Sequence, residues 1–362
     1  MKLLFRCDAS VMIGTGHLMR CLSIANTAKL LGWKICFVIR DPSEKIIDQI
    51  SCAGHKICKI ETTNHIQKKS PSTLQHGDWL PVSQNQDAQE TIDLIKDFNP
   101  AWVIVDHYAL DSEWHSTIKR QGVNILVIDD LGDRNVSCDL LLDQNLGASP
   151  EKYFGKVPSH CKLLLGPDYG LLRSEFREWR EKSIKGRLGR NMKYILITMG
   201  GVDAQNYTLR VLREIANSKR VKDFVFIVVI GELYPHKNSL YEFIETSRVK
   251  INVLSNVRNM AELMSKSDLC IGAAGVTSLE RCCLGLPTIS FAIANNQECV
   301  LEQLVKNECS IATSVKSILT DFEELLKPGE EHRLRQLSMK SAQLIDGYGV
   351  QRLLDQLERF CD

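Results

Sequence analysis

The sequence predicts an α/β protein with two doubly wound parallel sheets, each in its own domain. Short apolar runs alternate with amphipathic stretches along the chain, which is the pattern of parallel strands joined by helices. One charged segment separates this alternation into two series. The length of 362 residues suits two domains, and a composition of 44% hydrophobic and 25% charged residues is ordinary for a globular protein.

Four apolar runs in the N-terminal half predict the first series of strands. These are residues 3–7, 34–38, 102–106 and 124–129. A polar stretch at 61–85, rich in Ser, Thr, Gln, Asn and His, interrupts the pattern. Such stretches occur as surface excursions beside binding clefts, so we interpret 61–85 as a mobile insertion or an excursion near a cleft.

The second series begins after a charged segment at 176–191, where Arg and Lys crowd around two glycines. We interpret 177–191 as an interdomain linker. The expected domains are therefore 1–176 and 192–362, with the option that the last helix packs back onto the first domain. The predicted strands of the second series are residues 194–198, 224–230, 251–254, 269–272 and 288–291.

Charge, hydropathy and cysteine usage exclude several classes of protein. A net charge of +1 argues against nucleic-acid binding, and no apolar run is long enough to span a bilayer, so we expect neither a nucleic-acid nor a membrane partner. The first residues, interrupted by Arg6 and Asp8, do not have the pattern of a signal peptide. The 13 cysteines form no C-x-x-C pair and indicate no zinc site. We therefore expect a cytoplasmic protein with reduced thiols.

A glycine-bracketed turn near the N-terminus is the strongest functional signal. Gly14 and Gly16 follow the first predicted strand and allow positive φ and close approach of the backbone to a ligand. They deliver His17 to the start of a helix, where unpaired N–H groups and the helix dipole favour an anion. We predict that His17 is a catalytic base facing a phosphorylated ligand, with Arg20 one turn further on. The alternative is a histidine that only caps a helix.

The same turn begins a dinucleotide-binding fingerprint but does not complete it. Met19 occupies the place of the third glycine, so the close packing of helix on strand that an NAD site requires is not supported. We therefore expect no cofactor.

Two turns in the second half suit a diphosphate. After one predicted strand, Gly200 and Gly201 can turn backbone N–H groups toward a phosphate or a sugar hydroxyl. The stronger signal is 271–281, where a strand ends in a small-residue turn and the next helix opens with two hydroxyl side chains. Glu280 then offers two acceptor oxygens to a ribose.

The stretch 271–281 also has a purely structural interpretation. Thr277 or Ser278 is an N-cap in that case, and Glu280 is its capping-box partner. Three aspartates at predicted strand ends have a similar ambiguity. Each can orient His17 or a sugar substituent, or it can cap a helix. They are Asp8, Asp106 and Asp129.

These motifs and others along the chain resemble one family. The resemblance rests on residues 14–17, 20–22, 165–169, 171–173, 200–201, 277–278, 280–287 and 296–297. It is to the UDP-2,4-diacetamido-2,4,6-trideoxy-β-L-altropyranose hydrolase of pseudaminic acid biosynthesis, a family related to GT-B glycosyltransferases such as the lipid II glucosaminyltransferase. The motifs occur in the same order over nearly the whole chain, although Ala274 and Val276 stand where this family has glycine and serine.

The resemblance implies a GT-B-like fold, in which two Rossmann-like domains face each other across a cleft and UDP is held mainly by the C-terminal domain. It implies that His17 is the base, that Tyr108, Asn296 and Gln297 line the sugar pocket, and that no metal takes part. The residues expected to contact the substrate are Gly14, Gly16, Arg20, Tyr108, Gly201, Ala273, Gly275, Thr277, Ser278, Glu280, Asn296 and Gln297.

The implied activity is hydrolysis of this UDP-sugar to UDP and the free sugar, by attack of water on the anomeric carbon with inversion. Backbone N–H groups at the turns are expected to stabilise the departing diphosphate, so that no divalent metal is needed. A glycosyltransferase of the same architecture stays open, although the N-terminal half shows no basic and apolar stripe for a lipid acceptor. A binding protein without catalysis is the third interpretation. In each case the partner is a small UDP-sugar, and we expect a monomer.

Overall fold

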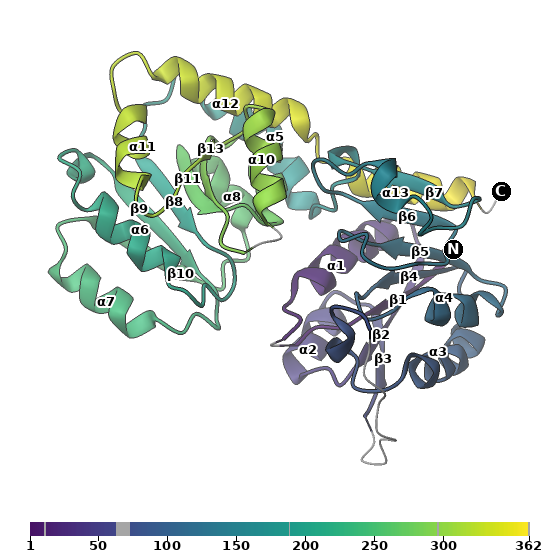
Figure 1. Ribbon diagram of the computed structural model, residues 1–362. Coiled ribbons are helices and arrows are strands. Elements are labelled where there is room, and N and C mark those ends of the chain that lie inside the picture. The colour runs from purple at the N-terminus through teal and green to yellow at the C-terminus, as the bar shows by residue number, and fades with distance from the viewer. Residues whose placement is uncertain (11, 63–72, 188, 295–296, 361–362) are drawn as a thin grey trace. The chain divides into compact units, whose positions relative to one another are not determined.

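The computed structural model describes residues 1–362 except 11, 63–72, 188, 295–296 and 361–362. The chain forms two compact units (Figure 1). Unit 1 comprises Met1–Arg173 and Tyr348–Asp362, and unit 2 comprises Ser174–Gly347.

Unit 1 contains a seven-stranded sheet in which all neighbouring strands are parallel. Its strands are β1 (Lys2–Cys7), β2 (Lys34–Arg40), β3 (Lys56–Ile60), β4 (Trp102–Asp106), β5 (Asn124–Ile128), β6 (Leu140–Asp143) and β7 (Lys162–Leu165). Their order across the sheet is β3-β2-β1-β4-β5-β6-β7. The winding therefore reverses between β1 and β4, which is the switch point of a doubly wound sheet.

Helices cover both faces of this sheet, as Figure 1 shows, because its central strands are apolar on both sides. One buried core lies under α1 (Gly16–Leu30), α2 (Glu44–Cys52) and α13 (Gly349–Arg359). The other lies under α3 (Gln84–Phe98) and α4 (Ser112–Lys119). Short 3-10 turns complete the unit: η1 (Gly77–Trp79), η2 (Pro150–Tyr153) and η3 (Pro167–Tyr169).

The last helix, α13, packs within unit 1 although 174 residues of unit 2 precede it in the chain. The indole Nε1 of Trp102 donates to the carbonyl oxygen of Leu357 at 3.1 Å, and Arg352 donates to that of Asp168 at 2.9 Å. Gly349 lies so close to the backbone of Gly170 that an added Cβ would fall 2.3 Å from the Gly170 carbonyl oxygen. These contacts attach the C-terminal end of the described chain to the first sheet.

Unit 2 contains a six-stranded parallel sheet in the order β10-β9-β8-β11-β12-β13. Its strands are β8 (Tyr194–Thr198), β9 (Val225–Ile230), β10 (Lys250–Ser255), β11 (Leu269–Ala273), β12 (Thr288–Phe291) and β13 (Ile311–Ala312). The order again reverses beside the first strand, between β8 and β11. Its helices are α5 (Ser174–Arg187), α6 (Tyr207–Ile215), α7 (Lys237–Thr246), α8 (Met260–Lys266), α9 (Thr277–Cys283), α10 (Glu298–Lys306), α11 (Ile318–Leu325) and α12 (Glu331–Leu344), with the 3-10 turn η4 (Val221–Asp223).

The charged segment that we interpret as a linker, 177–191, differs in the structure: most of it is α5, which lies inside unit 2. Its arginines donate to main-chain oxygens at the C-terminal ends of neighbouring helices. Arg180 donates to the carbonyl oxygen of Ile345 at 2.7 Å, and Arg187 donates to that of Met264 at 2.7 Å. The unit boundary falls instead between Arg173 and Ser174, so the residues 177–191 belong to the packing of the second unit.

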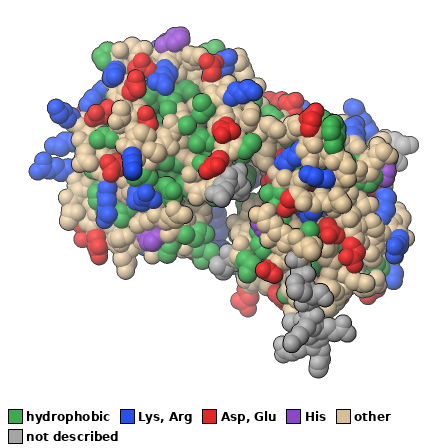
Figure 2. All heavy atoms as spheres, in the orientation of Figure 1, with side chains coloured by type: hydrophobic (Ala, Val, Ile, Leu, Met, Phe, Trp, Pro, Cys, Tyr) green, Lys and Arg blue, Asp and Glu red, His purple; other side chains and the backbone are tan. Residues whose placement is uncertain are grey.

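The surface charge agrees with the sequence composition, because basic and acidic side chains are interspersed over the face drawn in Figure 2. In the part of the chain that the structure describes, no helix is both long and apolar enough to cross a membrane. Of the polar stretch 61–85, residues 63–72 lie outside the described part. Of the remainder, Gly77–Trp79 form η1, α3 begins at Gln84, and the other residues form turns and irregular segments.

Candidate active site

The candidate catalytic residues of unit 1 meet at the carboxyl ends of its strands, beside the switch point. His17 lies in the helix that follows β1, and Asp106 ends the neighbouring strand β4. Cys7, the last residue of β1, is the register partner of Asp106. Ligands of doubly wound sheets bind outside strand ends at this point. The topology therefore joins two residues that are 89 positions apart in the sequence.

Gly14 shapes the turn between β1 and α1. Its φ of +78° is a left-handed conformation, which glycine adopts without strain, and its N–H donates to the carbonyl oxygen of Ser10 at 2.8 Å. Gly16 has no positive φ, because it is already the first residue of α1, after the N-cap Thr15. A Cβ at either glycine would meet no heavy atom within 4 Å, so the described structure leaves space beside this turn.

His17 is buried and forms a close pair with Asp106. Its Nδ1 lies 2.6 Å from Asp106 Oδ1, whereas Nη2 of Arg20 lies 3.2 Å from the same nitrogen. An ionised carboxylate only accepts hydrogen bonds, so we assign the ring hydrogen to Nδ1, which donates to Asp106. The lone pair then lies on Nε2. No described residue forms a hydrogen bond with Nε2, so it is the ring atom that can take a proton from a bound molecule.

Arg20 holds this pair in place. It donates to Asp106 through Nε at 2.5 Å and Nη2 at 2.6 Å, and to both oxygens of Asp130 through Nη1 at 2.9 and 2.7 Å. Burial alone would raise the pKa of Asp106, but the charges of Arg20 and His17 and their hydrogen bonds lower it below its ordinary value. Asp106 is therefore ionised. The described contacts of Arg20 are with protein, so its contact with substrate stays a prediction.

The other two aspartates that we considered for His17 have different partners. Asp8 accepts from Arg6 at 2.6 and 3.0 Å and lies 3.0 Å from His107 Nε2. Asp129 accepts from the backbone N–H of Gly132 and from Arg134, both at 2.8 Å. The structure thus distinguishes three residues that were equivalent in the sequence: only Asp106 contacts His17.

The loop that carries Tyr108 is anchored by His107. The backbone N–H of Ala109 donates to His107 Nδ1 at 3.1 Å, so Nε2 carries the hydrogen and donates it to Asp8. Burial lowers the pKa of His107 below its ordinary value, although Asp8 acts in the opposite direction. A buried neutral imidazole in a single tautomer therefore fixes residues 107–109.

Aromatic rings surround His17, and one of them was not among the predicted site residues. The ring of Tyr108 contacts His17 edge-on at 4.6 Å between centroids, and that of Trp79 does so at 5.5 Å. Trp79 and Tyr108 also stack at 5.4 Å, and His76 lies 4.6 Å from Trp79. The signal for Trp79 was a single tryptophan in a polar stretch, but only the fold shows that η1 brings it beside His17.

The turns that we predicted in unit 2 lie at the carboxyl ends of β8 and β11, on either side of its switch point. Gly200 has a φ of +90°, and Gly201 lies against Gly231, at the end of β9. A Cβ on Gly231 would fall 1.7 Å from the Gly201 carbonyl oxygen, so a side chain at 231 would displace this turn. Gly231 is a further positioning residue that we did not identify from the sequence.

A buried arginine supports the turn between β11 and α9. Arg281 donates through Nη2 to the carbonyl oxygen of Ala273 and to Ser278 Oγ, both at 2.8 Å, and through Nη1 to Thr277 Oγ1 at 3.3 Å. The N-cap of α9 is Val276, and α9 has no side-chain cap. The interpretation of Thr277 or Ser278 as an N-cap is therefore wrong. Their hydroxyl oxygens accept from Arg281, which leaves the hydroxyl hydrogens for other acceptors.

Three other predicted residues belong to unit 2. Glu280 is half-buried on α9. Gln297 Oε1 accepts from the N–H of Ile293 at 3.1 Å, and its Nε2 lies 3.6 Å from the place of a Cβ on Gly275. The structure therefore brings Gln297 and Gly275 together. Asn296 lies outside the described residues. Within the described part of the chain, no group of three or more His, Cys, Asp and Glu side chains could hold a metal ion.

The fold and these strand-end sites define a two-domain α/β protein of the GT-B class. Solved structures support this class. Acinetobacter baumannii MurG superimposes with a TM-score of 0.69 at 14% identity, covering 99% of this chain and all of that one. The Neisseria meningitidis UDP-GlcNAc 2-epimerase bound to UDP-GlcNAc has a TM-score of 0.67 at 15% identity, with the same coverage. The predicted fold class is confirmed.

Residues 194–357 match the Glycosyltransferase family 28 C-terminal domain. The chain is also 27% identical, over 84% of its length and 97% of the relative's, to the UDP-2,4-diacetamido-2,4,6-trideoxy-β-L-altropyranose hydrolase of Campylobacter jejuni. It is 27% identical, over 80% of its length, to an uncharacterized protein of Methanocaldococcus jannaschii, of which it spans 55%. The resemblance that the motifs indicated is thereby confirmed.

Proposed function

We propose that this protein hydrolyses UDP-2,4-diacetamido-2,4,6-trideoxy-β-L-altropyranose to UDP and the free sugar. The broader class, an enzyme that acts on a UDP-sugar, is supported by the named hydrolase among its relatives and by the family 28 domain. The finer proposal is carried by one observation. His17 Nδ1 lies 2.6 Å from an ionised Asp106, which directs the lone pair of Nε2 away from that carboxylate.

The proposed step uses His17 as a general base. The oxygen of a water molecule attacks the anomeric carbon while Nε2 takes one of its protons, and the bond from that carbon to the diphosphate oxygen breaks. UDP leaves with the electron pair, and the configuration at the anomeric carbon inverts. Asp106 orients the ring and stabilises the imidazolium that forms, as a carboxylate does for a histidine base in other enzymes.

The proposed nucleotide contacts are the two turns of unit 2. Backbone N–H groups at Gly201, Ala273 and Gly275, with the hydroxyls of Thr277 and Ser278, are groups that bind a diphosphate and stabilise charge as it departs. Arg281 lies directly beneath the second turn and adds a positive charge there. These roles stay proposals for each residue.

The alternative function is transfer of the sugar to an acceptor other than water. One observation favours it. Over 184 residues, 48% of each chain, the protein is 28% identical to the UDP-N-acetylglucosamine–N-acetylmuramyl-(pentapeptide) pyrophosphoryl-undecaprenol N-acetylglucosamine transferase of Acetivibrio thermocellus. The test is release of UDP from the purified protein and the UDP-sugar alone. Stoichiometric UDP and free sugar without any acceptor support hydrolysis. UDP release that appears only after an acceptor is added contradicts it.

The bond that breaks is a prediction of its own. In ¹⁸O-water we expect no label in UDP, because water attacks carbon and the diphosphate keeps its own oxygens. Mass spectrometry of the released UDP is the informative measurement, since the free sugar exchanges oxygen with solvent through its open form. One ¹⁸O atom in the β-phosphate would mean attack on phosphorus and would contradict the role given to His17.

For Glu280, we expect the substitution Glu280→Ala to weaken UDP binding by about 1.5–3 kcal/mol, the cost of hydrogen bonds to a charged acceptor. Calorimetry with UDP measures it, and Glu302→Ala, an exposed glutamate on α10, is the matched control. Unchanged UDP affinity together with a lower Tm would assign Glu280 a structural role only.

We also propose that the indole of Trp79, which packs on Tyr108 and His17, stacks on the sugar. Trp79→Ala should then raise KM for the UDP-sugar about three- to tenfold. Affinity for UDP, which has no sugar at this position, should stay the same. Trp179→Ala, a half-buried tryptophan on α5, is the control. Equal losses of UDP and substrate affinity would argue against sugar stacking.

A further inference from the structure

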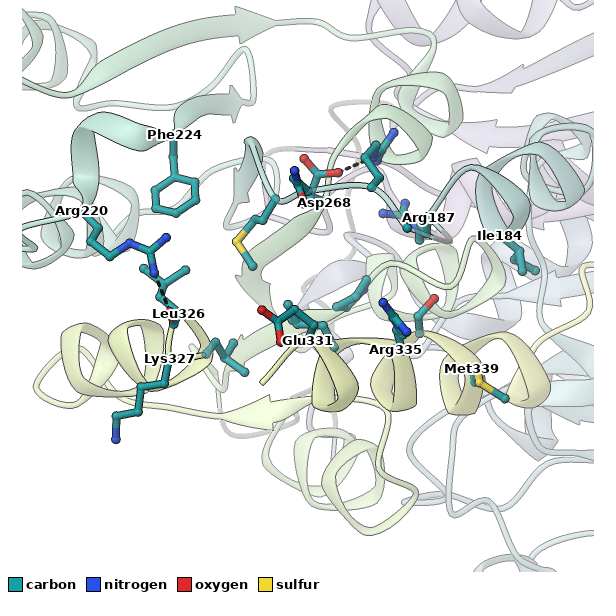
Figure 3. A pocket seen from close by; sticks show the side chains of 18 residues that line it. Ile184, Arg187, Arg220, Phe224, Asp268, Leu326, Lys327, Glu331, Arg335 and Met339 are labelled. Carbon is teal, nitrogen blue, oxygen red and sulfur yellow. Dashed lines mark hydrogen bonds and ion pairs between the residues drawn. The ribbon is translucent and has the colours of Figure 1, made fainter. Parts of the chain in front are cut away.

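Unit 2 contains a cavity beside the amino ends of its strands, whereas the candidate turns lie at their carboxyl ends (Figure 3). Its lining includes Met192, Phe224, Asp268 and Pro287, which lie just before β8, β9, β11 and β12, whereas the candidate turns follow the carboxyl ends of those strands. α12 forms another wall, as Figure 3 shows. The volume is about 370 Å³, within the range of small-molecule sites. The proposed hydrolysis uses none of these residues.

The floor of this cavity is apolar. Phe224 and Leu325 belong to the core of unit 2 and are almost fully buried. Met192 and Leu334 pack against this core but are only partly buried, and Met339 is exposed. A molecule in the cavity would therefore cover the exposed apolar surface of these last three side chains. This favours a ligand with an apolar body of its own.

The polar part of the lining is mainly basic, but its arginines differ in how far the protein uses them. Arg187 donates to the carbonyl oxygens of Leu284, Ser267 and Met264, so its guanidinium is committed to the fold. Arg190 pairs with Asp268 at 2.5 Å through Nε. The carboxylate of Asp268 also accepts two backbone N–H groups, so it does not repel an anion as a free carboxylate would.

Among the arginines of the lining, Arg335 has the most hydrogen-bond donors that the described protein does not use. It is exposed on α12, and its guanidinium donates to no described residue. Glu331, one turn earlier, accepts the N–H of Gly329 and forms no ion pair with Arg335 in the described part of the chain. Arg220, at the other end of the lining in Figure 3, uses Nε and Nη1 for Asp223 and Leu326 and keeps Nη2. Donors for an anion are thus present at both ends of an apolar floor.

We infer that this cavity binds a small amphipathic anion, an apolar body that carries a carboxylate, sulfonate or phosphate, with Arg335 as the main contact of the anionic group. The apolar floor accounts for the body and the unpaired guanidinium for the charge. The cavity lies at the amino ends of the strands and the proposed nucleotide turns at the carboxyl ends of the same strands. This ligand therefore binds together with UDP and does not compete with it.

The test uses 8-anilinonaphthalene-1-sulfonate, a fluorescent probe with an apolar body and one sulfonate, on the full chain. We expect saturable binding at one site, weakened about fivefold or more by Arg335→Gln and by Met339→Glu, which places a carboxylate at the exposed mouth. Arg213→Gln, an exposed arginine on α6 outside the lining, is the matched control and should leave the affinity unchanged. The neutral analogue N-phenyl-1-naphthylamine should not respond to Arg335→Gln.

Two further measurements locate the probe. Saturating UDP should leave its affinity unchanged, and hydrogen exchange should slow in residues 331–339 when the probe binds. The inference is overturned if both Arg335→Gln and Met339→Glu bind the sulfonate as the parent protein does. It is equally overturned if UDP displaces the probe or if protection falls on residues 200–206 or 273–280, because the probe then occupies the nucleotide turns.

Discussion

His17→Ala is expected to lower kcat by about a hundredfold or more while the protein still folds and binds UDP, because loss of a positioned base removes that much of the rate. His17 lies at the start of α1 and is not one of the apolar core residues of unit 1, and the proposed UDP contacts lie in unit 2. Steady-state kinetics of UDP release, together with calorimetry of UDP binding, measure the two effects separately.

The control for this substitution is His160→Ala, since the side chain of His160 is 61% exposed and its ion pair with Asp139 is long, at 3.8 Å. Added imidazole should restore part of the activity of His17→Ala if the missing group is a base. Unchanged kcat in His17→Ala would contradict the proposed mechanism. A large loss of UDP affinity would instead assign His17 to binding.

Asp106→Asn is expected to reduce both turnover and stability. An amide in this place no longer accepts from Nδ1 and Arg20 as a carboxylate does, so the ring tautomer that exposes the Nε2 lone pair is no longer enforced. We expect kcat to fall about a hundredfold. The free energy of unfolding should fall by about 3–5 kcal/mol, because a neutral amide leaves the buried Arg20 with only the partly exposed Asp130 to balance its charge. Steady-state kinetics measure the change in kcat, and denaturant unfolding measures the change in the free energy of unfolding.

The matched control is Asp130→Asn, because Asp130 pairs with Arg20 but does not contact His17. It should lose less stability than Asp106→Asn, since Asp130 is partly exposed, and it should keep the pH profile of kcat. If the two variants have the same turnover and the same pH profile, Asp106 stabilises the fold without orienting the base.

The same carboxylate makes stability depend on pH. The pKa of Asp106 is lower in the folded protein than its ordinary value, despite burial, because of Arg20 and His17. A lowered folded pKa adds stability above the unfolded pKa of about 4, and this stability is lost as the pH falls through the folded value. The difference in unfolding free energy between the parent and Asp106→Asn should therefore be largest near neutral pH and shrink below about pH 4. If the difference in unfolding free energy between the parent protein and Asp106→Asn stays constant down to pH 2, this prediction is contradicted.

Much of the fold could be predicted, because its strands are buried on both faces and appear as continuous apolar runs. All nine predicted strands are present, with ends shifted by up to two residues. Four strands were not predicted. β3, β7 and β13 are short edge strands, whereas β6 lies between β5 and β7 and has only four residues, too few to distinguish it from a loop segment. Edge strands have weak patterns because they contact fewer neighbours.

The sequence by itself determined the two doubly wound sheets, the glycine turn before His17 and the small-residue turns of the second half, because each follows from the order of residues within a few turns of chain. Only the tertiary structure decided which aspartate supports His17, that Trp79 lies beside it, and that Arg281 binds the hydroxyls taken for helix caps. The physical reason is register. Parallel pairing places Cys7 opposite Asp106, and so His17 against a carboxylate 89 residues away, a distance that no local pattern spans.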